Sequence, residues 1–220
     1  MKNPEVRIVE GAVPAFDYNI LESFKLSKTI TPLKISLDTV IANRKSSHNF
    51  NKTTLQQLSD ILWYVAKVKS TILQDDGYIL TYRGTASAGA RHPIDIVVYN
   101  PKLLSSSYLY YYNPFEHSLN KLAGSSSDIT SFIGHIDEIV NTANATVLWF
   151  VAHKNRTRAK YKYADSLIYR DAGVLIHGFQ MVCTALDLNC CPIGSLGEPF
   201  ISNFFKNQTG VCGLGGILIG

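Results

Sequence analysis

The run from Ala145 to Ala152 is rich in apolar, β-branched and aromatic residues and has no polar face. A strand of this kind has to be covered by other elements on both of its faces. We therefore expect it at the centre of a sheet, with further layers on either side. The longest apolar run elsewhere, near Ile61 to Val68, is broken by Lys67 and is far too short to span a membrane.

Helices and strands are expected along the rest of the chain without strict alternation, which favours an α+β fold. Thr53 can cap a helix, with Gln56 completing a capping box. Apolar residues recur at helical spacing and would give that helix one apolar face: Leu55, Leu58, Ile61, Leu62 and Val65. Asp171 can cap a long helix that ends near Leu186. The other expected helices are 36–43 and 131–141, and the other expected strands are 79–83, 94–99, 108–112 and 215–219.

The N-terminal part of the chain has a different character. Residues 1–34 are expected to be irregular, because Pro14 and Pro32 interrupt any long helix. We divide the chain into an arm, residues 1–37, and a single domain, residues 38–220.

Composition narrows the classes of function. The 220 residues are 46% hydrophobic and 17% charged, which suits a packed domain and excludes a disordered chain. The net charge is only +4 and the Lys and Arg residues are scattered, so no nucleic-acid partner is expected. The start of the chain has no long apolar stretch behind basic residues, so no signal peptide is expected. The four cysteines show no metal-ligand spacing, so we expect reduced thiols, no metal site and a cytoplasmic protein.

A first candidate site is the segment 44–50, Arg-Lys-Ser-Ser-His-Asn-Phe, at the end of the expected helix 36–43. Its guanidinium, hydroxyl and imidazole groups could surround a phosphate. A basic helix end that is merely solvated is the alternative.

A second candidate is the loop 83–93, Arg-Gly-Thr-Ala-Ser-Ala-Gly-Ala-Arg-His-Pro, between two expected strands. Small residues there allow the backbone to approach a ring or a phosphate closely, and Ser87 and Arg91 supply donors. A tight connecting loop that binds nothing is the alternative.

These segments together resemble the FMN-dependent nitroreductase superfamily. The pattern Arg-x-Ser-x-basic-x-Phe stands here as Arg44, Ser46, His48 and Phe50. The loop 87–93, followed by 112–114 and 117–119, resembles one branch, the azoline dehydrogenases of ribosomal peptide maturation. Segments 169–173, 180–188 and 192–194 resemble the second half of the family. The likeness runs from about residue 38 to the C-terminus and implies a nitroreductase-like fold, with a central mixed sheet flanked by helices in an intertwined homodimer.

The resemblance also implies roles for individual residues. Arg44, Ser46 and His48, with Lys45 nearby, would hold the phosphate of FMN. Ser87 and Gly89, with Arg91 as a further donor, would reach the flavin from the other subunit. Ile193 and Gly194 would lie along the flavin ring, with a backbone N–H facing its N5. Many family members continue with a basic segment that also holds the phosphate, and here Arg83 or Arg91 could share that task.

The azoline dehydrogenases also carry a Lys-Tyr pair ahead of the long helix. Two pairs compete here, Lys160-Tyr161 and Lys162-Tyr163. We favour Lys162 and Tyr163 as the catalytic pair, because their distance along the chain to Tyr169-Arg170 lies nearer to the distance seen in the family. Ordinary pKa values are roughly 10.4 for Lys and 10 for Tyr, so either group would need its pKa lowered to accept a proton at neutral pH. An exposed basic and aromatic loop is the alternative.

Three readings of function follow. The first is a dehydrogenase that oxidises an azoline ring in a peptide, acting with a cyclodehydratase complex. The second is a nitroreductase or quinone reductase that uses NAD(P)H. The third is a non-catalytic flavin-binding scaffold subunit. The sequence leaves open the substrate, the electron acceptor and the need for partner subunits.

Overall fold

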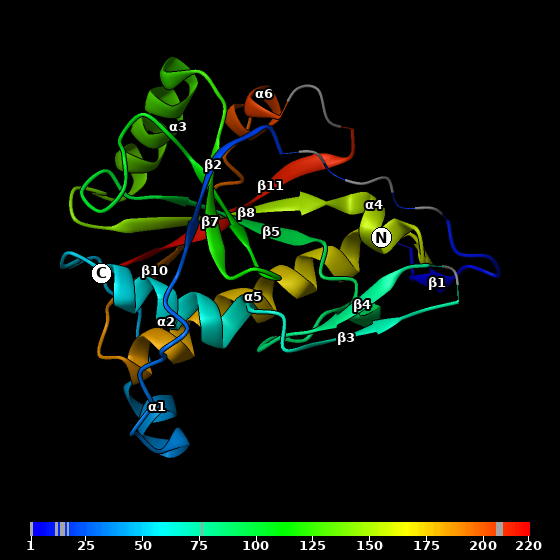
Figure 1. Cartoon of the computed structure of the whole chain (residues 1–220), viewed down its shortest axis with the longest axis horizontal. Coiled ribbons are helices and arrows are strands. Elements are labelled where there is room, and N and C mark those ends of the chain that lie inside the picture. Colours follow the sequence, from blue (N-terminus) through cyan, green and yellow to red (C-terminus); the bar gives the residue numbers. More distant parts are fainter. Residues whose placement is uncertain (1, 12, 14–15, 17, 76, 206–208) are drawn as a thin grey trace.

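The computed structural model of the chain is built around one seven-stranded sheet, in the order β10-β11-β8-β5-β6-β7-β2 (Figure 1). It describes residues 2–11, 13, 16, 18–75, 77–205 and 209–220; Pro14 lies outside this part. Every neighbouring pair of strands in the sheet runs antiparallel. The expectation of a mixed sheet is therefore wrong, whereas the α+β class is confirmed.

The expected central strand is β8 (Thr146–His153), and all of its residues are buried. It lies between β11 (Val211–Ile219) and β5 (Ile94–Tyr99), with which it pairs over most of its length. Both of its faces are covered, which explains why the segment carries no polar alternation.

The remaining elements have the following bounds. The other sheet strands are β2 (Ile20–Lys25), β6 (Tyr110–Asn113), β7 (Ser118–Leu122) and β10 (Cys190–Ile193). Two small antiparallel pairs are β1 (Glu5–Val6) with β9 (Tyr161–Lys162), and β3 (Ser70–Leu73) with β4 (Ile79–Tyr82). The helices are α1 (Leu37–Asn43), α2 (Leu55–Ala66), α3 (Ser126–Ile139), α4 (Lys154–Arg158), α5 (Asp165–Ala185) and α6 (Phe200–Phe204), with a 3-10 turn at Ala88–Ala90.

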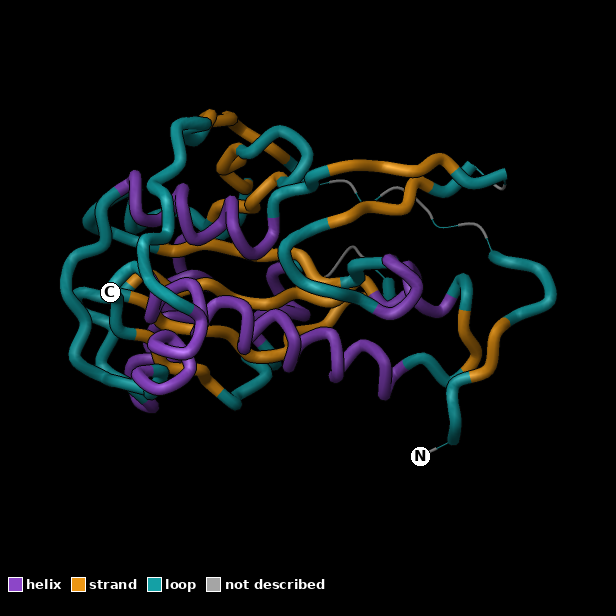
Figure 2. The backbone as a smooth tube through the Cα atoms, turned by 90° about the horizontal axis from the view of Figure 1, so that it is seen from below, coloured by secondary structure: helices purple, strands orange, loops and turns teal. Residues whose placement is uncertain are grey.

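Helices cover the sheet on both faces, so the molecule has three layers (Figure 1). α2 and α5 pack on one face over a core that includes Leu58, Leu62 and Phe179. α3 and α6 pack on the other face over a core that includes Phe132 and Trp149. Figure 2 shows α5 running along the sheet as the longest helix. It therefore borders much of one face of the molecule.

We expected residues 1–34 to be irregular, but part of this segment forms regular structure. β2 forms an edge strand of the main sheet by pairing with β7. All of its residues are exposed, so it has no buried face that a hydrophobic pattern could reveal. Tyr18, just before β2, is buried in the core. The division of the chain after residue 37 stays a prediction, although β2 joins the arm to the sheet.

Three helix starts differ from the expectation. α3 begins at Ser126, five residues before the expected start at 131. The capping box of α2 uses Thr54 and Gln57, one residue later than the predicted Thr53 and Gln56. Thr53 is buried, and its hydroxyl donates to the carbonyl of Ile219. α5 begins at Asp165, more than a turn before Asp171. Asp171 is therefore not a cap, and its carboxylate has another partner.

The four cysteines are free thiols, as expected. In the part of the chain that the structure describes, no helix is long and apolar enough to cross a membrane. Among the same residues no three His, Cys, Asp or Glu side chains are grouped so that they could hold a metal ion.

Candidate functional site

The segment 44–48, called here the basic turn, follows α1 directly. Gln180 of α5 donates from Nε2 to Ser46 Oγ at 3.4 Å. The backbone N–H of Ser47 donates to the carbonyl of Cys190, the first residue of β10, at 2.9 Å. The basic turn is thus placed beside the C-terminal half of α5 and the start of β10.

Among the residues that the structure describes, the cations of the basic turn have no ion-pair partner. Arg44 is half-buried, while Lys45, Ser46 and His48 are exposed. Within the described ranges, neither Arg44 nor Lys45 takes part in an ion pair. Contact with the Cys183 thiol lowers the pKa of Cys190 most, burial opposes this, and the charge of Arg44 adds to the lowering. The positive charge therefore faces β10 as well as solvent, and it is available to an anion.

Ile193 and Gly194 lie at the far end of the same strand. Ile193 is buried, whereas Gly194 is exposed, and a side chain added there would meet open space. Four residues of strand separate Gly194 from Cys190, a span of about 13 Å. A ligand with an anionic end at the basic turn could therefore extend along β10 and reach the backbone of Gly194.

A polar hollow of about 520 Å³ adjoins the basic turn. His48 lines it together with the amide side chains of Asn49, Asn51, Asn141, Asn144 and Asn189, along with Phe50 and Ala143. Amide groups can both donate and accept hydrogen bonds. This face of the basic turn can therefore accommodate the polar part of a ligand.

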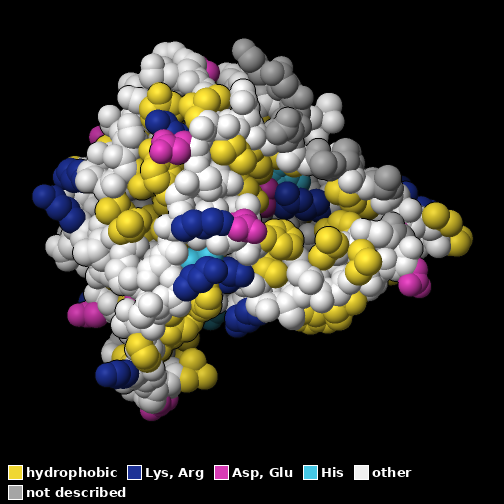
Figure 3. Space-filling model, viewed as in Figure 1, with side chains coloured by type: hydrophobic (Ala, Val, Ile, Leu, Met, Phe, Trp, Pro, Cys, Tyr) yellow, Lys and Arg dark blue, Asp and Glu magenta, His cyan; other side chains and the backbone are white. Residues whose placement is uncertain are grey.

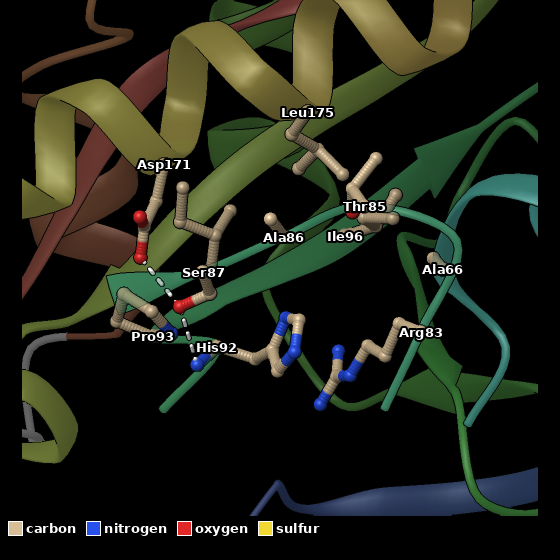
Figure 4. A pocket seen from close by; sticks show the side chains of 11 residues that line it. Ala66, Arg83, Thr85, Ala86, Ser87, His92, Pro93, Ile96, Asp171 and Leu175 are labelled. Atoms are coloured by element: carbon tan, nitrogen blue, oxygen red, sulfur yellow. Dashed lines mark hydrogen bonds between the residues drawn. The ribbon is translucent and has the colours of Figure 1, made fainter. Parts of the chain in front are cut away.

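The second candidate segment, 87–92, is called here the serine loop, and Asp171 holds it in place (Figure 4). Ser87 donates from Oγ to Asp171 Oδ2 at 2.6 Å, and the N–H of Ala88 donates to Asp171 Oδ1 at 3.0 Å. Ser87 Oγ in turn accepts from the N–H of His92 at 2.9 Å. The Ser87 hydroxyl has thus committed its only proton to Asp171, so it can offer a ligand an acceptor but not a donor.

The carboxylate of Asp171 is buried, and this burial raises its pKa despite the hydrogen bonds from Ser87 and Ala88. No signal for this role was recognised in the sequence. The available clue was that Asp171 shares helical spacing with the apolar Ile168 and Leu175, which would bury its carboxylate and require donors for it.

The serine loop is tightly turned. Gly89, Ala90 and His92 have φ of 60°, 53° and 42°, in the left-handed region that favours glycine. A Cβ on Gly89 would lie 2.8 Å from Tyr161 Oη and 3.1 Å from Lys160 Cδ. The pair Lys160-Tyr161 therefore packs directly against the loop.

Lys162 and Tyr163, favoured from the sequence, lie further out. Both are exposed, and Lys162 lies opposite Glu5 in the antiparallel pairing of β9 with β1. Lys2 donates from Nζ to Tyr163 Oη at 3.5 Å. Their catalytic role stays a prediction, and of the two pairs it is Lys160-Tyr161 that the structure brings to the serine loop.

Arg91 is buried and engaged. It forms an ion pair with Glu10, and its guanidinium lies 3.9 Å from the centre of the Tyr78 ring. Arg83 lies beside the serine loop, where it and His92 help to line a small pocket of about 20 Å³ (Figure 4). A pocket of this size has room for one water molecule.

The basic turn and the serine loop contact opposite sides of α5. Their contacts on the helix, Gln180 and Asp171, are nine residues apart. At 3.6 residues per turn this is about 2.5 turns, so the two side chains point in opposite directions and are separated by about 14 Å along the axis. Within one chain the two predicted halves of the site therefore do not face each other. Arg83 and Arg91 lie on the serine-loop side, away from the basic turn.

Comparison with known proteins identifies one matching family and several similar structures. The model of the nitroreductase family matches residues 41–214. No curated protein matches the chain. A candidate nitroreductase from Ralstonia eutropha JMP134 has a similar structure, with a TM-score of 0.69 at 20% identity, covering 100% of this chain and 98% of that one. A candidate nitroreductase from Anabaena variabilis gives 0.68 at 16% identity, covering 98% of this chain and 42% of the other.

A third similar structure is a chain of the Escherichia coli microcin synthetase McbBCD complex with truncated pro-MccB17 bound. The TM-score is 0.60 at 16% identity, covering 86% of this chain and 74% of that chain. At these identities the solved structures establish the fold.

Proposed function

The chain belongs to the nitroreductase family of flavin oxidoreductases, and from that premise we propose that it is an FMN-dependent oxidoreductase acting as a homodimer. The unpaired charge of the basic turn, placed at one end of β10 with Gly194 at the other, is the observation that carries the proposal. A similar fold from Desulfovibrio desulfuricans, a candidate nitroreductase, was solved in complex with FMN.

The residues present fit this cofactor. Arg44, with Lys45 and His48, would hold the phosphate, and the hydroxyl of Ser46 would donate to it. Gly194, which has open space at its α-carbon, would allow the flavin ring to approach the backbone closely. FMN, once bound, supplies the two-electron chemistry, and the protein fixes the position of the substrate.

The placement of both segments on α5 supports an intertwined homodimer. Because the basic turn and the serine loop lie on opposite sides of the helix, one chain offers two half-sites rather than one whole site. A second copy would bring its serine loop, with Ser87, Gly89 and Arg91, to the basic turn of the first. Two complete sites would then form across the interface.

For the reaction, we favour dehydrogenation of an azoline-type ring in a peptide. Aromatisation of such a ring removes a hydride and a proton, so it needs a base beside the ring. Tyr161 or Lys160, packed against the serine loop at Gly89, would take that proton. The similarity to a chain of the microcin synthetase complex supports a peptide substrate and a cyclodehydratase partner. Such a protein would work in the cytoplasm.

Reduction of a nitro or quinone compound with NAD(P)H is the second candidate. The family match and the similar structures from Ralstonia and Anabaena support it equally. A flavin-binding scaffold without turnover is the third. Steady-state oxidation of NADPH with a nitroaromatic acceptor would favour the reductase, and indifference to nicotinamides would favour the dehydrogenase.

The absorbance spectrum of the purified protein tests the cofactor. We expect a yellow dimer, and the variant Arg44→Gln should bind FMN at least about tenfold more weakly because a charge-assisted contact is lost. A colourless, monomeric protein that is indifferent to added FMN would refute the proposal.

The two Lys-Tyr pairs are separated by matched variants. Tyr161→Phe with Lys160→Gln, and Tyr163→Phe with Lys162→Gln, would each be assayed for flavin content and for turnover of an azoline peptide. Loss of turnover with flavin retained identifies the catalytic pair. Retained turnover in both variants would exclude both pairs as the base, whereas a protein that binds flavin but never turns over an azoline peptide would favour the scaffold or the reductase.

A further inference from the structure

A second hollow, of about 320 Å³, lies on the other side of the serine loop from α5. It is bounded by the β3–β4 hairpin, by the start of β5 and by the end of β6. Basic, acidic and histidine side chains meet in a recess above this hairpin on the face drawn in Figure 3. The lining includes three arginines: Arg83, Arg91 and Arg156.

Two of these arginines are neutralised. Arg156 donates from both terminal nitrogens to the two carboxylate oxygens of Asp95, at 2.8 and 2.9 Å. Asp95 is fully engaged, because Tyr18 also donates to Oδ2 at 2.7 Å and His153 Nε2 lies 2.9 Å from the same oxygen. Arg91 pairs with Glu10.

Arg83 is the exception. Its Nε donates to Thr81 Oγ1 at 3.2 Å. No carboxylate forms an ion pair with it anywhere in the described ranges. Burial is the largest influence and lowers the pKa of Arg83; the charge of Asp95, which is already paired with Arg156, opposes this, and the charge of Arg156 adds to the lowering. A half-buried guanidinium that has no ion-pair partner of its own among the described residues is costly to maintain, and Arg83 lines a hollow that can hold such a partner.

The remaining groups of the hollow define the rest of the ligand. His92 is held neutral by burial, with a pKa of about 3, and therefore adds no charge at neutral pH. The walls include the rings of Phe16, Tyr111 and Phe115, as well as Pro114 and Ile79. Apolar walls with one directional charged group are typical of a small-molecule site.

We propose that this hollow binds a small organic carboxylate, with Arg83 taking the carboxylate and the aromatic wall taking an apolar body. A guanidinium matches a carboxylate in a two-point hydrogen bond. The hollow and the small pocket of the serine loop share Arg83 and His92. A ligand bound here would therefore lie against that loop. The proposal does not depend on the flavin, because the basic turn lies across α5 from this hollow.

Calorimetric titration of the purified dimer with benzoate tests the proposal, with benzamide and inorganic phosphate as comparison ligands. Benzoate should bind, and benzamide and phosphate should bind at least about tenfold more weakly, since one lacks the charge and the other the apolar body. Arg83→Gln should weaken benzoate binding about 10- to 100-fold while FMN binding is retained. Arg170→Gln, which removes an exposed arginine of α5, should leave benzoate binding unchanged.

Arg44→Gln separates this site from the flavin site: it should weaken FMN binding and retain benzoate binding. The proposal is overturned if benzoate fails to bind at concentrations of about 10 mM, if Arg83→Gln binds it as tightly as the natural protein, or if benzamide binds equally well. Tight binding of phosphate without binding of benzoate would contradict the proposal that the aromatic wall takes an apolar body.

Discussion

Replacing Asp171 by alanine is expected to lower the free energy of unfolding by about 2 to 4 kcal/mol. The carboxylate accepts from Ser87 Oγ at 2.6 Å and from the N–H of Ala88 at 3.0 Å. Each hydrogen bond to a charged group contributes about 1.5–3 kcal/mol, and both donors would lose their acceptor inside the protein. The total stays below the sum because burial, the largest influence, raises the pKa of Asp171, so the charged carboxylate is itself held at a cost.

Asp171→Asn should cost about half as much. The amide keeps an oxygen for Ala88 N–H, but its nitrogen faces a Ser87 hydroxyl that already accepts from His92. Asp165→Asn provides the matched control, because Asp165 is an exposed acid on the same helix, paired with Arg158 at the surface. Its effect should stay below about 1 kcal/mol.

Urea unfolding at neutral pH measures these differences, and a double-mutant cycle with Ser87→Ala isolates the contact. We expect a coupling energy of about 1–2 kcal/mol between the two residues. The sign of the pH dependence is also fixed. Because the native pKa of Asp171 is raised, the stability linked to its protonation is fully present below the ordinary pKa and is lost as pH rises through the raised one. The cost of Asp171→Ala at neutral pH comes instead from the two donors that lose their acceptor. Additive effects of Asp171→Ala and Ser87→Ala, or a loss below 1 kcal/mol in Asp171→Ala, would refute this role.

Three further outcomes follow from buried groups. His117 is fully buried, and burial lowers its pKa to about 4. Neutral His117 therefore contributes stability above about pH 6.5, and up to about 3 kcal/mol of it is lost as pH falls toward 4; urea titrations of His117→Gln should show a flatter pH profile. Asp95→Ala should cost about 3–5 kcal/mol by leaving Arg156 unpaired, measured by the same unfolding assay, and a loss under 1 kcal/mol would contradict it. Gly89→Ala should cost about 1–2 kcal/mol because φ is 60° and the new Cβ meets Tyr161 Oη. Adding Tyr161→Phe should recover part of that loss, and no recovery would exclude the clash.

Elements with a one-sided or fully apolar pattern could be predicted from the sequence. The apolar face of α2 and the buried strand β8 were found because local periodicity reports burial directly. The basic turn could be singled out as a candidate because its cations are adjacent in the chain, and its role stays a prediction.

Other features depend on distant partners. β2 is exposed along its whole length, so only its pairing with β7 marks it as a strand. The cap of α2 shifted by one residue because Thr53 bonds instead to the carbonyl of Ile219. Of the two Lys-Tyr pairs, the one at the serine loop is selected by the β1–β9 pairing, which places Lys162 opposite Glu5 on the surface. Such contacts join residues that are far apart in the chain, so they cannot be predicted from neighbouring sequence positions.

The two half-sites on α5 differ in how firmly they are built. The serine loop is held by a buried carboxylate that satisfies the Ser87 hydroxyl and the Ala88 N–H, so its shape does not depend on a ligand. Beyond bonds to its own neighbours in the chain, the basic turn is held by one backbone contact, to Cys190, and by the long 3.4 Å contact to Gln180, and its cations form no ion pair in the described chain. An anionic ligand would supply the missing charge to the basic turn and nothing that the serine loop lacks. If the basic turn holds the flavin phosphate, as we propose, loss of the flavin should therefore loosen the basic turn and leave the serine loop in place.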